Sequence, residues 1–113
     1  MHANATLVDA RGGFVAVCDV WLDDVGLAIE VDSIEYHAGH EGFESTVRRN
    51  TRYARAGVVV VPVLPAQLRS HPAQVLRDIV RARDAAAARP RPAVYIDHEA
   101  RTSSGREGWR WGA

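Results

Sequence analysis

The sequence predicts an α/β fold, with a mixed β-sheet that begins as an antiparallel meander, continues as α-β-α, and is flanked by helices. Three observations indicate this fold class. Short β-rich stretches alternate with glycine- and aspartate-containing turns through residue 32. A stretch with helical periodicity then ends at Gly57. Residues 58–64 form a continuous apolar run, which is typical of a strand covered on both faces.

The N-terminal part is expected to form three strands, over residues 4–8, 14–22 and 27–32. Residues 9–13 and 23–26 contain the aspartates and glycines that favour turns. Short turns join neighbouring antiparallel strands, so these segments predict a meander.

A polar segment over residues 33–40 separates the meander from a helix predicted over residues 41–56, with Gly57 as its C-terminal cap. Helical spacing places four residues on one face: Phe43, Val47, Asn50 and Ala54. The opposite face carries three basic residues: Arg48, Arg52 and Arg55.

A strand is predicted over residues 58–64, with Pro62 expected near its end or where pairing stops. A helical turn over 65–70 precedes a helix that starts at Pro72 and runs to about residue 88. The expected buried stripe of that helix is Val75, Leu76, Ile79, Val80 and Ala86.

Residues 1–92 are expected to form a single domain, because 113 residues suit one core. Residues 93–113 are expected to form a flexible tail, in which 93–97 can add a small edge strand. The single cysteine, Cys18, excludes an intramolecular disulfide and a multi-cysteine zinc site. No apolar run approaches the ~18 residues that span a bilayer, and no signal peptide is apparent, so we expect a cytoplasmic protein.

The formal net charge of zero hides a strong segregation of charge along the chain. Residues 1–44 hold nine acidic residues and one arginine, a net charge of −8. Residues 45–92 hold ten arginines and two acidic residues, a net charge of +8. An acidic half can gather a divalent cation and a basic half can bind a polyanion through its phosphates, so the pattern predicts one functional element of each kind.

Three acidic residues interrupt apolar strands, and they are the strongest candidates for chemistry. Glu30 and Asp32 share one face of their strand, because side chains alternate. Asp19 joins them if the turn between the strands has two or four residues, and a four-residue turn places Asp19 directly opposite Glu30. A three-residue turn would place Asp19 on the other face.

Carboxylates on adjacent strands suit Mg²⁺ or Mn²⁺, which take oxygen ligands. Such an ion can polarise a phosphodiester and lower the pKa of bound water. The alternative is that these acids pair with arginines or line an exposed sheet face. Cys18 alternates with Asp19 along its strand, so we expect it to be an inert buried thiol on the other face.

Several segments together resemble a known family. They are Cys-Asp19-Val-Trp-Leu, Leu-Ala-Ile-Glu30-Val-Asp32-Ser, Tyr-His37, the run from Val47 to Gly57, and Val-Val-Val-Val-Pro-Val-Leu-Pro. Over about residues 4–88 the chain resembles the small restriction-endonuclease-like domains of domain-of-unknown-function family 559. Those domains are similar to the very-short-patch-repair (Vsr) endonucleases of the PD-(D/E)xK nuclease superfamily.

The resemblance implies a restriction-endonuclease-like sheet with a metal site and assigns roles by position. Asp19 and Glu30 match the two metal-binding acids, and Asp32 falls where most members carry a catalytic lysine. The Vsr branch uses histidine instead, which makes His37 the candidate base. Arg49 matches a helix arginine of the family that contacts phosphate or a core carboxylate.

The sequence therefore predicts a Mg²⁺- or Mn²⁺-dependent DNA endonuclease, with Asp19, Glu30, Asp32 and His37 in its site. Nucleic acid is expected to contact Arg48, Arg49 and Arg52. The alternative is a catalytically inactive nuclease-fold module that binds DNA or a protein of a defence or toxin–antitoxin system. The missing lysine favours that alternative.

Overall fold

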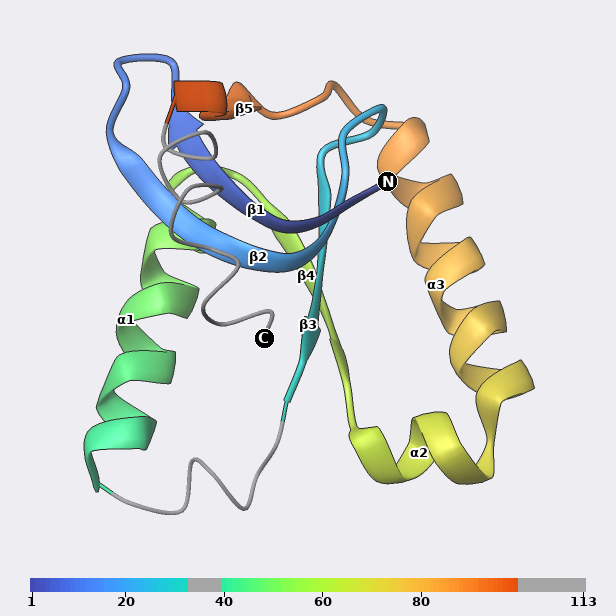
Figure 1. The fold of residues 1–113 in the computed structure, drawn as a ribbon. Coiled ribbons are helices and arrows are strands. Elements are labelled where there is room, and N and C mark those ends of the chain that lie inside the picture. The colour runs from blue at the N-terminus through green and yellow to red at the C-terminus, as the bar shows by residue number, and fades with distance from the viewer. Residues whose placement is uncertain (33–39, 100–113) are drawn as a thin grey trace.

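A computed structural model describes residues 1–32 and 40–99, which form a five-stranded mixed sheet with helices on both faces (Figure 1). The strands are β1 (His2–Asp9), β2 (Phe14–Leu22), β3 (Leu27–Val31), β4 (Val59–Val63) and β5 (Val94–Ile96). The helices are α1 (His40–Arg55), α2 (Pro65–Ser70) and α3 (Pro72–Ala87). The predicted α/β class with a mixed sheet is confirmed.

The strand order across the sheet is β4-β3-β2-β1-β5. β1, β2 and β3 form the predicted antiparallel meander, and β5 pairs antiparallel with the free edge of β1. β4 pairs parallel with β3 after the crossover through α1. None of the helices in the described part of the chain is long and apolar enough to span a membrane.

Pro62 is the second-last residue of β4, near the strand end as predicted, and lies opposite Glu30 in the parallel register. The backbone carbonyl of Val63 accepts the Asp32 N–H at 2.8 Å. The backbone polar groups of Val63 therefore point toward β3, and the backbone nitrogen of Pro62 points away from it. β4 is an edge strand, so the missing amide donor of Pro62 leaves no gap in the ladder.

α1 and α3 cover opposite faces of the sheet (Figure 1). Tyr53 of α1 and Ala56, the residue after this helix, pack with Trp21, Leu7 and other residues of the main core. α3 packs through Val75, Ile79, Ala82 and Ala86 onto β3 and β4.

The predicted buried face of α1 is wrong by one position. Val47 is 47% exposed, and Asn50 and Ala54 are also exposed, whereas Tyr53 is buried. The half-buried residues that share its face are Gly42, Thr46, Arg49 and Ala56. The arginines do not form one exposed stripe either, because Arg52 folds back onto the β1–β2 hairpin while Arg48 and Arg55 are exposed.

One further prediction, the buried stripe of α3, needs correction. Leu76 and Val80 are 61% and 47% exposed, because the contact stripe of α3 is narrower than its apolar surface. Residues 94–96 form the predicted small edge strand, β5, in which Val94 is fully buried. The rest of the predicted tail, from residue 100, lies outside the described residues.

The turn between β2 and β3 has four residues, because Leu22 pairs with Leu27. Gly26 ends this turn with φ +71°, and the chain leading to β5 passes directly over it. A Cβ atom on Gly26 would lie 2.6 Å from Pro92 Cδ. The turn therefore needs glycine both for its backbone conformation and for this close approach.

We predict that Gly26→Ala destabilises the protein more than Gly12→Ala. Both glycines have positive φ, which costs an alanine about 1–2 kcal/mol, but a Cβ atom on Gly12 meets nothing within 4 Å. Overpacking against Pro92 adds about 1–3 kcal/mol at Gly26. Urea denaturation of both variants measures the difference, and equal losses would show that Pro92 moves aside freely.

Candidate functional site

The carboxylates of Asp19 and Glu30 face each other across β2 and β3. The four-residue turn sets the register Val20↔Ile29, and the next pair in this register is Asp19 with Glu30. Asp19 Oδ2 accepts the backbone N–H of Val31 at 2.8 Å, which holds this carboxylate against β3. Burial raises the pKa of Glu30 most, and the Asp19 charge and a hydrogen bond that the protonated Glu30 donates to Asp19 raise it further, so the two carboxyl groups lie within hydrogen-bonding reach.

Glu30 is 2% exposed, and no other charged or polar residue in the described part of the chain is buried. Burial raises its pKa from 4.5 to about 7, against the lowering effects of the Tyr53 hydroxyl and the Arg49 charge. None of the ion pairs found among the described residues includes Glu30. Near neutral pH the neutral and the charged forms of the Glu30 side chain are therefore both populated.

Tyr53 is the residue of this site that sequence reasoning missed. Its hydroxyl donates a hydrogen bond to Glu30 Oε1, and its ring is 1% exposed in the main core. Burial and the Glu30 contact raise the pKa of Tyr53 far above its usual value. A signal was present, because Tyr53 lies four residues after Arg49 on the same helical face.

Cys18 is buried as predicted, and burial raises the pKa of its thiol to about 11, which disfavours the reactive thiolate. It does not lie on the face opposite to the carboxylates, because the side chain of Tyr53 and the charge of Glu30 both influence it. Regular alternation fails in this part of β2, where Cys18 and Trp21 contribute to the same core cluster. Asn4, which lies between the paired residues Ala3 and Ala5 and opposite Asp19, has φ +51°.

Asp32 and Arg49 form the second part of the site. Arg49 Nη2 lies 3.6 Å from Asp32 Oδ1, and the two side chains are 24% and 29% exposed. Within the described residues, the buried atoms Arg49 Nε and Asp32 Oδ1 have no hydrogen-bond partner. The charge of Arg49 also lowers the pKa of Glu30. Arg49 therefore acts on two acidic residues, Glu30 in β3 and Asp32 just after this strand.

The other predicted site residues are not all found beside Glu30 and Asp32. His37 lies outside the described residues. Arg48 is exposed on α1 and lies 3.7 Å from Glu44. Arg52 donates from Nε to the Val15 carbonyl at 2.7 Å, which directs it toward the β1–β2 hairpin.

The oxygen donors of Asp19 and Glu30 fit a hard divalent cation, which proteins often bind through one or two carboxylates while it keeps several waters. Glu30, buried among apolar groups, is the kind of carboxylate whose charge a cation would neutralise. No group of three or more histidine, cysteine or acidic residues placed to hold a metal occurs within residues 1–32 and 40–99.

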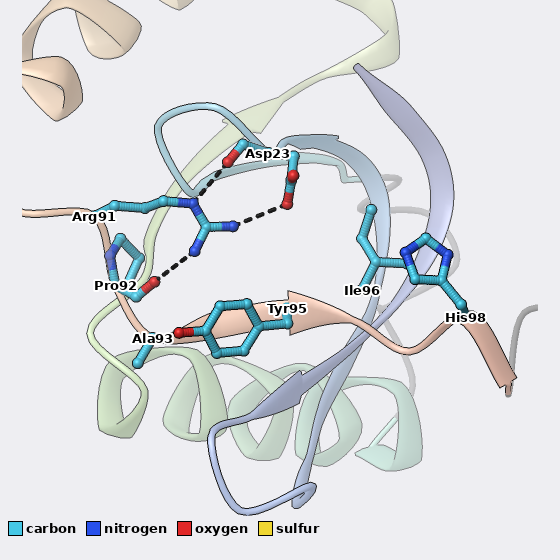
Figure 2. A pocket seen from close by; sticks show the side chains of 7 residues that line it. All are labelled: Asp23, Arg91, Pro92, Ala93, Tyr95, Ile96 and His98. Atoms are coloured by element: carbon cyan, nitrogen blue, oxygen red, sulfur yellow. Dashed lines mark hydrogen bonds and ion pairs between the residues drawn. The ribbon is translucent and has the colours of Figure 1, made fainter.

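A hollow beside the β2–β3 turn and β5 has neither Asp19 nor Glu30 in its lining (Figure 2). It has a volume of about 580 Å³, and Arg91 and Tyr95 are among its lining residues. The Arg91 guanidinium donates to the Asp23 carbonyl, to Asp23 Oδ1 and to the Pro92 carbonyl, at 2.7–2.9 Å. Arg91 therefore ties the chain before β5 to the β2–β3 turn, and its hydrogen bonds serve the fold.

Comparison with known proteins found no matching family model, no matching curated protein and no matching solved structure. The resemblance to family 559 and the restriction-endonuclease-like fold therefore stay predictions.

We predict that stability falls as pH rises from about 4.5 to about 7 because of Glu30. Its pKa is about 7 in the folded protein and near 4.5 when solvated, so the folded state holds the proton more tightly. The stabilisation is complete below the lower value, and its loss amounts to a few kcal/mol, on the order expected from linkage. Glu30→Gln should flatten this decline in urea denaturation from pH 4 to 8. An unchanged slope would contradict the assignment.

Tyr53→Phe is expected to raise the pKa of Glu30 further, because it removes the hydrogen bond that favours the charged carboxylate while keeping the ring. Titration of the Glu30 carboxyl carbon by NMR measures this shift. Tyr95→Phe, at a half-exposed tyrosine on β5, is the matched control. A Glu30 titration that is identical in both variants would refute the role of the hydroxyl.

Proposed function

We propose that this protein is a Mg²⁺- or Mn²⁺-dependent phosphodiesterase that acts on DNA. The observation that supports it best is the pair of facing carboxylates, Asp19 and Glu30, on neighbouring strands. A buried glutamate beside a half-buried aspartate, with neither in an ion pair found in the described structure, costs stability, which is typical of functional sites.

Asp19 and Glu30 would hold the cation. When bound, that ion would polarise the phosphodiester and lower the pKa of a water molecule. Asp32 would position the attacking water, and His37 would accept its proton. Arg49, beside both Glu30 and Asp32, would contact the phosphate, because a guanidinium forms paired hydrogen bonds to phosphate oxygens.

The basic residues supply the DNA-binding part of the proposal. Arg48 and Arg55 are exposed on α1, and Arg52 is half-buried beside the hairpin. Such charges bind phosphates without reading sequence, so they would support affinity and orientation only.

A second candidate function is a catalytically inactive nuclease-fold module that binds DNA or a partner protein. Two observations favour it. Asp32, where the resembled family carries lysine, lies beside Arg49, and Glu30 already accepts a hydrogen bond from Tyr53. In this second candidate function, the Arg49 guanidinium and the Tyr53 hydroxyl contact Asp32 and Glu30 in place of a cation.

Glu30→Gln is expected to reduce Mn²⁺-dependent cleavage of plasmid DNA at least about a hundredfold, since the charge stabilisation provided by a metal is worth several kcal/mol. Asp78→Asn, on the exposed face of α3, is the control and should cleave like wild type. The measurement is gel-resolved nicking at a series of Mn²⁺ concentrations.

Titration calorimetry with Mn²⁺ separates the two candidate functions. Mn²⁺ binding that Glu30→Gln abolishes supports the phosphodiesterase. Wild-type protein that binds DNA but neither binds Mn²⁺ nor cleaves would favour the inactive module. Cleavage that persists in Glu30→Gln would rule out the assigned site.

A further inference from the structure

Two arginines lie over aromatic rings, and the two pairs are closely similar in geometry. The Arg52 guanidinium carbon lies 5.2 Å from the Phe14 ring centroid, and that of Arg91 lies 5.4 Å from the Tyr95 ring centroid. Phe14 is 54% exposed and Tyr95 is 49% exposed. Each pair therefore presents a half-exposed ring beside a guanidinium.

The pairs differ in how the positive charge is compensated. Arg91 Nη2 lies 2.8 Å from Asp23 Oδ1, so a carboxylate neutralises it. Arg52 donates from Nε to the neutral carbonyl of Val15, and no ion pair joins it to an acidic residue within the described part of the chain. The Phe14 pair thus retains a positive charge, while the Tyr95 pair does not.

The Phe14 pair also borders a hollow of about 260 Å³ between the β1–β2 hairpin and the last turn of α1. Its lining residues are Asp9, Phe14, Val15, Arg52, Arg55 and Ala56. Arg55 is exposed and has no ion pair among the described residues.

Asp9 is the one acidic residue in the lining. Its Oδ1 accepts the backbone N–H groups of Arg11 and Gly13 at 2.9 and 2.8 Å, which occupies this oxygen in the hairpin turn. Two arginines against one carboxylate leave a net positive charge in the hollow. A ring face next to uncompensated guanidinium groups suits a ligand that carries both flat rings and negative charge.

We propose that this hollow is a binding subsite for single-stranded nucleic acid, in which a base stacks on Phe14 and the backbone phosphates contact Arg52 and Arg55. Stacking needs an unpaired base, which distinguishes this ligand from a continuous duplex. The inference rests on the nucleic-acid partner of the proposed function and does not depend on its catalysis. Arg52 precedes Tyr53, so the subsite begins one residue away from the side chain that contacts Glu30.

The test is fluorescence anisotropy with a labelled oligothymidylate of about 12 nucleotides, in EDTA so that cleavage cannot interfere. Phe14→Ala is expected to weaken binding at least about fivefold, and Phe14→Trp should retain it because a ring face remains. Tyr95→Ala, the matched control with a similarly exposed ring, should change binding less than about twofold. Arg55→Ala should lower the dependence of log Kd on log salt concentration by about 0.7.

The outcomes separate this inference from the proposed catalysis. Equal affinities for wild type, Phe14→Ala and Tyr95→Ala would overturn the subsite while leaving nucleic-acid binding intact. Tight binding to a duplex of the same length that Phe14→Ala does not affect would overturn it as well. If wild type binds neither oligonucleotide, the subsite is refuted, and the Mn²⁺ cleavage assay with Glu30→Gln decides the catalytic proposal separately.

Discussion

Glu30 carries the only charged side chain buried in the described structure, and three residues from two elements are arranged around it. Asp19 approaches it from β2, Tyr53 from α1, and Arg49 one helical turn before Tyr53. An unpartnered carboxylate at this depth would cost several kcal/mol, on the order of the stability of a small domain. The position of α1 on the sheet and the register of β2 with β3 therefore determine which groups lie around the Glu30 carboxyl group.

That register depends in turn on contacts far from the carboxylates. The four-residue β2–β3 turn sets which residues face one another, and Gly26 lets Pro92 pack directly on it. Arg91 then joins Asp23 of the same turn to the chain that enters β5. Arg91 and Pro92, just before β5, therefore help to hold the turn that brings Asp19 opposite Glu30.

Strand and helix boundaries were predictable to within two residues, because turn residues and hydrophobic periodicity are local signals. The sequence predicts that Asp19 faces Glu30 only if the turn between their strands has a suitable length, and the sequence alone does not fix that length. The predicted buried face of α1 is wrong because the Tyr53 ring is buried and the Arg49 side chain is half-buried, while their polar ends reach Glu30 and Asp32. Alternation also misplaced Cys18, because the irregularity of the sheet beside Asn4 is a tertiary feature.

The same contacts bear on whether the chain performs chemistry. A metal site must keep its carboxylates close together before the ion arrives, and the Tyr53 hydroxyl and the Val31 amide do this at a cost in charge repulsion between Asp19 and Glu30. A purely structural cluster would have no reason to keep that repulsion, since an apolar side chain at position 30 would pack against Tyr53 without it. Arg49 lies nearby and still forms its ion pair with Asp32 and not with Glu30. A cation between the two carboxylates would offset both the cost of burying Glu30 and its repulsion with Asp19, and this is the physical reason for the proposed metal site.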